Sequence, residues 1–322
     1  MSSSAIKDLA ASVRQRLFNL SRERKQPFDL VLTRYAIERL LYRLSRSKYS
    51  NDFVLKGATL FAIWTEEIHR PTRDLDLLAF GEASADALRA TFQELCALDI
   101  ESDGLVFDPE IVRVTDIRAA QEYPGQRVQL MAKLGNARIP VQVDVGFGDA
   151  VIPVPEEVEY PTMLSFPPPR LKAYPKEAVV AEKLHTMVVL GIANSRMRDF
   201  YDIWTMSRLF MFDGGKLSQA IRATFERRRT VIPSTIPLAF TSEFATDTDK
   251  RAQWRGFLHR SGLGNNSVDE RGSGDGRPTD ELERVIDDLR GFLLPPLAAL
   301  AEGVSFANTW PPKGPWMESK AE

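Results

Sequence analysis

The 322-residue sequence holds one cysteine, Cys96, and three histidines. A single thiol excludes a disulfide framework and a cysteine-rich zinc or iron–sulfur site. Such low cysteine usage is also typical of a reducing compartment. We therefore expect a cytoplasmic protein without disulfide bonds.

Long apolar runs are also missing. The longest apolar stretches, near residue 240 and at 292–301, are well short of the roughly 20 residues needed to cross a bilayer. The first 18 residues carry charges throughout and lack the apolar core of a secretory signal. We accordingly expect a soluble protein that is not exported and makes no membrane contact.

No charge sign is in large excess, because 42 Lys and Arg residues face 44 Asp and Glu residues, a formal net charge of −2. This balance excludes a histone-like polycation. The charges are nevertheless segregated: residues 1–50 hold 11 basic and 4 acidic residues, 51–150 hold 9 and 17, and 170–230 hold 12 and 6. Basic segments around an acidic one suit a metal-binding core between surfaces that attract a polyanion. Ordinary solvated helix faces are the alternative interpretation.

The period of the hydrophobic pattern changes along the chain. Helical periodicity is followed by alternating or short apolar runs typical of strands, and it returns after a proline-rich stretch at 151–175 that predicts an extended connector. The predicted helices are 4–22, 28–47, 58–67, 83–98, two within 176–210, 216–229 and 279–302, and the predicted strands are 53–57, 74–80, 111–117, 127–134 and 138–147.

This order predicts an α+β protein with a mixed sheet and flanking helices. We expect N-terminal helices over 1–50, a sheet domain over 51–160 and a helical C-terminal domain over 161–302. Residues 303–322 are expected to form a flexible tail.

Two aspartates on one predicted strand are the sharpest chemical signal. Asp74 and Asp76 stand at i and i+2, so their carboxylates share one face of the strand. Adjacent carboxylates repel unless a cation neutralises them, and Mg²⁺ is usually held by one or two carboxylates together with substrate phosphates. Asp144, on a strand that can lie beside the first, would complete a two-metal site for phosphoryl or nucleotidyl transfer. Ordinary surface carboxylates are the plainer interpretation of a D-x-D motif.

A glycine turn precedes this acidic pair. Gly57 ends a predicted strand and opens a predicted helix, so backbone N–H groups can meet a phosphate with no side chain in the way. Thr59 adds a hydroxyl, and Lys56 and Arg73 supply positive charge close by. The turn is therefore predicted to bind nucleotide phosphates.

Four sequence blocks, in this order, resemble the AbiEii/AbiGii toxin family of nucleotidyltransferase-like proteins: LKGATLFAIW, RPTRDLDLLAF, VQVDVGFGD and EAVVAEKLHTMVVLGIANSRMRDFYDIW. The resemblance covers residues 53 to about 210. It implies a DNA polymerase β-like nucleotidyltransferase fold with a helical C-terminal domain. It also implies a Mg²⁺-dependent toxin of a toxin–antitoxin or phage-defence operon, with an NTP as donor and the tRNA 3′ end as acceptor. Its partner would be a winged-helix antitoxin encoded nearby.

The resemblance also implies roles for the acidic residues and the glycine turn. Asp74 and Asp76 would ligate the metals, and Asp144 would ligate one metal and help to deprotonate the attacking hydroxyl. Gly57 and Thr59 would cradle the triphosphate.

In the helical block, Lys183 is the best candidate for a phosphate or base contact, because it offers a point charge on a long stem. Asp199 and Asp202 stand at i and i+3, on one face of the predicted helix. They would orient Lys183 or Arg198, or touch the nucleotide. A structural salt-bridge network between two helices is an equal alternative.

The sequence thus predicts a nucleotidyltransferase that moves nucleotides from an NTP to RNA, with tRNA as the expected acceptor, and so blocks translation and growth. One alternative keeps the chemistry and changes the acceptor to a protein or a small molecule. A second alternative is a binding or regulatory module that keeps the fold and has lost turnover.

Overall fold

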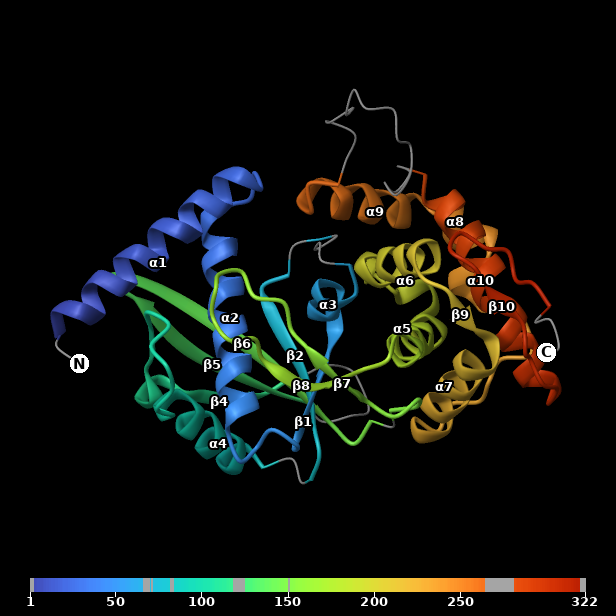
Figure 1. Cartoon of the computed structure of the whole chain (residues 1–322). Helices are drawn as coiled ribbons and strands as arrows, with labels where there is room; N and C mark the ends of the chain where they lie inside the picture. The colour runs from blue at the N-terminus through green and yellow to red at the C-terminus, as the bar shows by residue number, and fades with distance from the viewer. Residues whose placement is uncertain are drawn as a thin grey trace. The chain divides into compact units, whose positions relative to one another are not determined.

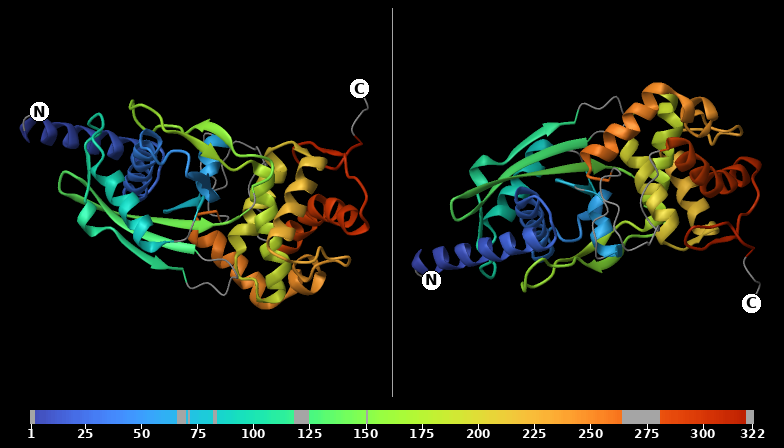
Figure 2. Two further views of the ribbon diagram at one scale, coloured as in Figure 1. Left: turned by 90° about the horizontal axis from the view of Figure 1, so that it is seen from below. Right: turned by 90° about the horizontal axis from the view of Figure 1, so that it is seen from above.

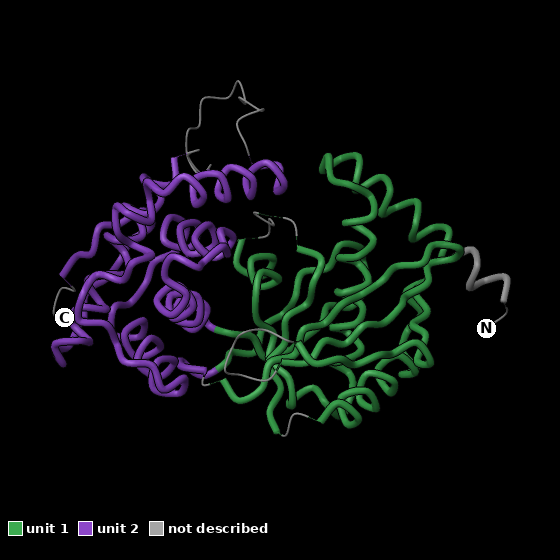
Figure 3. Tube along the Cα trace, turned by 180° about the vertical axis from the view of Figure 1, so that it is seen from behind, with its two compact units in different colours: residues 1–149, 155–174 green, residues 150–154, 175–322 purple. Residues whose placement is uncertain are grey.

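The computed structural model describes residues 3–65, 70, 72–81, 84–117, 125–149, 151–263 and 281–318. The chain forms two compact units, green and purple in Figure 3. Unit 1 holds residues 1–149 and 155–174, and unit 2 holds residues 150–154 and 175–322. The N-terminal helices therefore share one compact unit with the sheet.

Unit 1 is built on a mixed sheet in the strand order β3-β5-β6-β2-β1-β8-β7, with β4 paired to the β5 strand (Figure 1). The strands are β1 (Phe53–Lys56), β2 (Asp74–Ala79), β3 (Leu105–Phe107), β4 (Arg113–Asp116), β5 (Gly125–Leu134), β6 (Ala137–Phe147), β7 (Glu156–Glu159) and β8 (Arg170–Ala173). The β2–β6 and β1–β8 pairs are parallel, and the other pairs are antiparallel.

The two faces of this sheet differ because side chains alternate along each strand. On one face, Leu75 and Leu77 of β2 and Val143 and Val145 of β6 are buried. On the other face, polar side chains at the intervening positions are only partly buried. The buried face is core, and the polar face is available for chemistry.

Helix α2 packs on β6 and contacts both α1 and α4 (Figures 1 and 2). The helical elements of unit 1 are α1 (Ser3–Glu23), α2 (Phe28–Arg46), η1 (Gly57–Leu60), α3 (Phe61–Thr65), α4 (Ala85–Ala97) and η2 (Pro109–Ile111), where η denotes a 3₁₀ helix. Residues 35–44 of α2 are all buried, so this helix carries charged side chains into the core.

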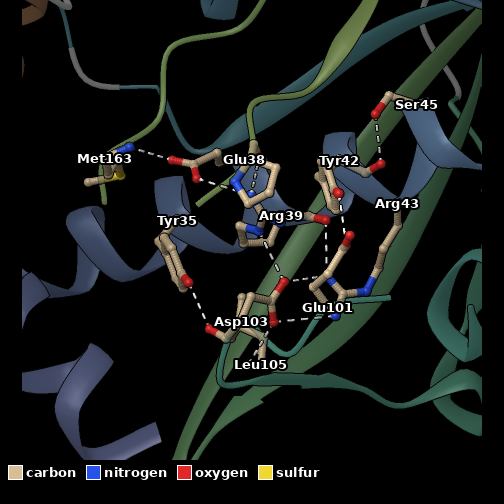
Figure 4. A network of polar contacts seen from close by, with 11 residues as sticks. Tyr35, Glu38, Arg39, Tyr42, Arg43, Ser45, Glu101, Asp103, Leu105 and Met163 are labelled. Carbon is tan, nitrogen blue, oxygen red and sulfur yellow. Dashed lines mark hydrogen bonds and ion pairs between the residues drawn. The ribbon is translucent and has the colours of Figure 1, made fainter. Parts of the chain in front are cut away.

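Two of these buried side chains are arginines that share one aspartate (Figure 4). Arg39 Nε donates to Asp103 Oδ2 at 3.0 Å, and Arg43 Nη1 donates to the same oxygen at 2.8 Å. Glu38 accepts a hydrogen bond from the backbone N–H of Met163 at 2.7 Å. Burial raises the pKa of Glu38 to about 7. The network ties α2 to the chain before β3 and to the β7–β8 connection.

Unit 2 is mainly helical, which confirms the expected helical C-terminal region; the mixed sheet with flanking helices is confirmed as well. Its elements are α5 (Lys176–Leu190), η3 (Gly191–Ala193), α6 (Met197–Leu209), β9 (Phe212–Asp213), α7 (Gly214–Arg227), η4 (Leu238–Phe240), α8 (Ser242–Thr246), α9 (Thr248–Arg260), α10 (Leu282–Glu302) and β10 (Thr309–Trp310). Helices α8 and α9 are not among the predicted elements. Within the described residues, no helix is long and apolar enough to cross a membrane.

Two segments are more ordered than the sequence suggests. The predicted connector at 151–175 contains β7 and β8, and β8 extends the sheet by pairing with β1. In the predicted flexible tail, β10 pairs with β9 and Trp310 is 6% exposed. Trp316 stacks on Phe292 of α10, with ring centroids 5.8 Å apart. Aromatic burial therefore holds the described part of this segment, and residues 319–322 lie outside the described residues.

Candidate active site

Four charged side chains form one row across the polar face of the sheet. Lys56 of β1 is paired in register with Asp76 of β2. Asp76 is paired with Asp144 of β6, and Asp144 with Arg127 of β5. Paired residues of neighbouring strands point to the same face, so two carboxylates lie side by side between two cations. We call these four residues the charged row.

Asp74 lies in the next row of the same face. It stands two residues before Asp76, so both side chains point to one side of β2. Asp74 is paired in register with Gln142, Gln142 with Gln129, and Gln129 with Arg113 of β4. The structure thus brings the three predicted carboxylates together on two adjacent parallel strands, and each of them is partly exposed.

Arg127 is not among the predicted site residues, yet it forms a bidentate ion pair with Asp144. Its Nε donates to Asp144 Oδ1 at 2.8 Å, and its Nη2 donates to Oδ2 at 2.9 Å. These hydrogen bonds raise the pKa of Arg127, and the charges of Asp144, Asp74 and Asp76 add to the rise, against the effect of burial. Arg127 therefore acts as the counterion of the carboxylate cluster.

The position of Arg127 follows from the β5–β6 hairpin. Gly135, with a φ of 58°, and Asn136 form a two-residue turn between the paired residues Leu134 and Ala137. A two-residue turn sets the register of every pair along both strands. Counting back from the Gly-Asn turn in the sequence would have found Arg127 opposite the predicted Asp144.

Gly57 packs directly against the Asp76 carboxylate. Its φ is 76°, a conformation that side chains rarely adopt, and an added Cβ would lie 2.1 Å from Asp76 Oδ2. Both the backbone conformation and the close approach therefore require glycine. The predicted glycine turn is present, and it brings backbone to the acidic pair.

The helix expected over 58–67 is present as far as Thr65, and residues 66 and 67 lie outside the described residues. It starts as the 3₁₀ turn η1 and continues as α3 for five residues, Phe61–Thr65. Thr59 lies in η1 and is 2% exposed, and its Oγ1 has no hydrogen-bond partner among the described residues. Because the hydroxyl is covered, a phosphate can reach it only if the surrounding turn moves.

The two predicted cations beside the turn both have acidic partners. Lys56 Nζ is 3.1 Å from Asp149 Oδ2, and both side chains are largely buried. Arg73 Nη2 is 2.6 Å from Asp29 Oδ2 of α2, and both side chains are more than half exposed. The Lys56 pair is therefore part of the framework, whereas the Arg73 pair lies in solvent and exchanges at little cost.

The carboxylates fit a divalent cation only in part. Asp74 and Asp76 present oxygen ligands on one face, which suits Mg²⁺. No group of three or more His, Cys, Asp or Glu side chains is arranged to hold a metal within the described ranges. Asp144 does not join the other two carboxylates as a ligand, because both of its oxygens accept hydrogen bonds from Arg127. The pair Asp74 and Asp76 therefore fits a cation, and Asp144 can join only after Arg127 releases it.

In unit 2, Lys183 of α5 lies against two aspartates of α6. Its Nζ donates to Asp199 Oδ1 at 2.5 Å and is 2.9 Å from Asp202 Oδ2. Arg196, rather than the predicted Arg198, supplies an arginine contact, with Nε 2.7 Å from Asp199 Oδ2. Burial alone would raise the pKa of Asp199, but Lys183 and Arg196 hold that pKa well below its usual range. The three predicted residues thus meet in a buried ion-pair network between two helices.

A family model described as "Nucleotidyl transferase AbiEii toxin, Type IV TA system" matches residues 39–273. The crystal structure of JHP933 from Helicobacter pylori is 11% identical, with a TM-score of 0.41 and coverage of 82% of this chain and 90% of that chain. The crystal structure of a "putative nucleotidyltransferase from H. pylori" is 11% identical, with a TM-score of 0.42 and coverage of 82% and 92%. No curated protein matches the chain.

Proposed function

The chain belongs to the AbiEii nucleotidyl transferase toxin family of type IV toxin–antitoxin systems, and on that premise we propose that it transfers nucleotides from an NTP to an RNA acceptor. The proposed acceptor is the tRNA 3′ end, so that transfer blocks translation and inhibits growth. The family implies an antitoxin partner and a nucleotide substrate. We take the partner to be a winged-helix protein encoded nearby and the place of action to be the cytoplasm.

The observation that supports this proposal most is the carboxylate cluster on the polar face of the sheet. Asp74 and Asp76 share one side of β2, and Asp144 is the register partner of Asp76. The backbone of Gly57 lies against the Asp76 carboxylate. Carboxylate oxygens gathered on a partly exposed face are the ligands that a divalent cation prefers. Nucleotidyl transfer is a reaction that uses such a cation.

In the proposed reaction, Asp74 and Asp76 would hold Mg²⁺, which would offset the negative charge of the NTP phosphates. A hydroxyl of the acceptor attacks the α-phosphorus. A new P–O bond forms as the bond to pyrophosphate breaks, and the hydroxyl proton passes to the Asp144 carboxylate.

Asp144 can accept this proton only after Arg127 has moved, because both carboxylate oxygens accept bonds from that guanidinium. The Arg127 side chain is 38% exposed, so it has room to turn. We propose that Arg127 transfers its two donors to the triphosphate when the NTP binds. A guanidinium fork fits phosphate oxygens as well as a carboxylate.

The other predicted phosphate contacts come from the glycine turn and from two basic side chains. Gly57 and Thr59 would cradle the triphosphate, with the condition that η1 moves to uncover the Thr59 hydroxyl. Lys56 and Arg73 would add positive charge, and Arg73 is the more accessible of the two.

Lys183 is proposed as a further contact of the NTP. Asp199 and Asp202 would then serve to hold its ammonium in place. A purely structural role for this cluster is the competing interpretation, and its kinetic test is given in the Discussion.

The test is transfer of label from each of the four α-³²P NTPs to total tRNA in the presence of Mg²⁺, with Asp76→Ala as the matched control. Label on tRNA that disappears in the variant supports the proposal and identifies the donor. Thermal unfolding of the variant should be unchanged or shifted upward, because one of two neighbouring like charges is removed.

Other outcomes identify the competing functions. A wild-type protein that inhibits growth without labelling RNA would point to a protein or small-molecule acceptor. A protein that labels no acceptor, and whose growth inhibition is unchanged by Asp76→Ala, would be a binding or regulatory module. A winged-helix reading frame directly upstream would support the toxin–antitoxin assignment.

A further inference from the structure

A hollow of about 380 Å³ lies beside Asp74 on the polar face of the sheet. Its lining includes Arg113 of β4, Gln129 and Met131 of β5, and Gln142 of β6. This volume is within the range of small-molecule sites, which starts near 300 Å³. All of its lining residues belong to unit 1.

The hollow exists because neighbouring strands differ in length. Strand β2 begins at Asp74, opposite Gln142, whereas β6 already begins at Ala137. No residue of β2 lies beside residues 137–141 of β6, which leaves open space next to that stretch. The hollow is therefore one row away from the charged row, at the end of β2 where the acidic pair begins.

The side chains in the hollow are available to a ligand. Neither Gln129 nor Gln142 makes a side-chain hydrogen bond with any residue that the structure describes, although the two are register partners. Each amide offers both donors and an acceptor. Arg113 is exposed and forms no ion pair within the described part of the chain. The lining thus combines two amides that have no hydrogen-bond partner among the described residues with an accessible cation.

This combination of amides, apolar side chains and a cation suits a single nucleotide as the ligand. Nucleobase edges present both donors and acceptors, which two neighbouring amides can meet. Met131 and Pro140 are register partners in the next row and supply apolar contact for the face of a base. Arg113 suits the adjoining phosphate. A fully apolar or a purely anionic ligand would leave either the amides or the apolar residues without a partner.

We propose that this hollow binds the terminal nucleotide of the RNA acceptor, with Gln129 and Gln142 on the base and Arg113 on the phosphate. The inference rests on the transfer reaction proposed above. Asp74 belongs both to the hollow and to the acidic pair, so a nucleotide held there has its free hydroxyl delivered to the carboxylate cluster. Arg73 also lines the hollow beside Asp74, so its charge would lie where the two substrates meet, and the NTP is expected to bind on the Asp76 and Gly57 side of the cluster.

The experiment is steady-state kinetics of the full chain with total tRNA and the active NTP, comparing wild type with Gln129→Ala/Gln142→Ala and with Arg113→Ala. The matched control is Arg138→Ala, which removes an exposed arginine from the same face of β6 outside the hollow. The double variant should raise the KM for tRNA by about tenfold, as expected for two lost hydrogen bonds, and leave the KM for NTP unchanged. Arg113→Ala should raise the KM for tRNA several-fold more than Arg138→Ala does.

A second measurement does not depend on turnover. Filter binding of end-labelled total tRNA without NTP should show the same loss of affinity in the double variant, with an unchanged melting temperature. A raised KM for NTP with an unchanged KM for tRNA would make the hollow the donor site and overturn the proposal. Unchanged values for both substrates, in variants that label tRNA normally, would also overturn it. If wild type labels no RNA at all, the reaction proposed above fails instead, which is a distinct result.

Discussion

Unit 1 contains two arginine–aspartate contacts of equal length in different surroundings. Arg43 Nη1 and Asp103 Oδ2 are 2.8 Å apart, with side chains 6% and 1% exposed. Arg127 Nε and Asp144 Oδ1 are also 2.8 Å apart, but their side chains are 38% and 21% exposed. The first pair lies in the network under α2, and the second lies in the charged row.

The difference in burial decides what each pair can do. In the network, Asp103 accepts from two arginines and from the backbone N–H of Leu105, so any exchange of partners would leave a buried charge unpaired. In the charged row, water can replace either partner while the other moves. The same ion pair is therefore a structural contact in one place and an exchangeable contact in the other.

The largest expected effect is on stability and comes from the buried pair. Asp103→Ala leaves Arg39 and Arg43 in the core without their carboxylate, which should lower the free energy of unfolding by about 3–5 kcal/mol. The matched control, Asp144→Ala, removes the partner of a partly exposed arginine and should cost about 1 kcal/mol or less. Urea unfolding measures both variants, and equal losses would remove the distinction between the two pairs.

Substitutions of Lys183 distinguish a nucleotide contact from a purely structural ion-pair network in unit 2. Lys183→Ala leaves two buried aspartates without the ammonium that both of them contact, so the free energy of unfolding should fall by about 3 kcal/mol. Lys183→Arg keeps the charge and should recover most of this loss, but it changes the geometry of a phosphate contact. A raised KM for NTP in Lys183→Arg supports the proposed role. Unchanged kinetics in that folded variant would make the cluster purely structural.

Glu38 gives the buried network a pH dependence. Its pKa of about 7 in the folded chain lies above the ordinary value of 4.5, because burial disfavours the carboxylate. The folded state then binds a proton that the unfolded state has released, so stability should fall as pH rises from 4.5 to about 7 and level off above it. Glu38→Gln should remove this fall in the free energy of unfolding, about 3 kcal/mol between pH 4.5 and 7, as measured by urea unfolding at several pH values. Parallel wild-type and variant curves would contradict the assignment.

The smallest expected effect is on the exposed pair. Arg127→Met removes the counterion of Asp144 from a partly solvated site and should change unfolding free energy by less than about 1 kcal/mol. Because the freed carboxylate can then meet a cation, MgCl₂ should raise the melting temperature of this variant more than that of wild type. Arg138→Met is the control, since it removes an exposed arginine of the same face. Equal Mg²⁺ shifts in all three proteins would argue against exchange at Asp144.

Much of the local structure was predictable because it depends on neighbouring residues. Apolar periodicity located most helices and strands, including the long hairpin 127–134 and 138–147, which the structure extends by one or two residues at its ends. The D-x-D spacing was enough to put Asp74 and Asp76 on one face, because strand alternation is a property of the backbone. The Gly-Asn turn carried enough information to find Arg127 as well.

Other features depended on contacts between distant segments. Asp103 and Arg39 are 64 residues apart, and an aspartate in a loop gives no local sign that two arginines will enclose it. The pairing of β8 with β1 joins residues more than 100 positions apart inside a proline-rich stretch. Burial removes water from charges and strand edges, so each of them needs a partner within the protein, and that partner can come from a distant segment.

The sequence by itself determined the order of elements, the acidic pair and its face, and the glycine that stands against it, because these follow from backbone geometry within one or two elements. Only the tertiary structure decided which charges are enclosed and which stay exchangeable. The physical reason is that the strength of an ion pair depends on how much water surrounds it, and exposure is set by the packing of the whole unit.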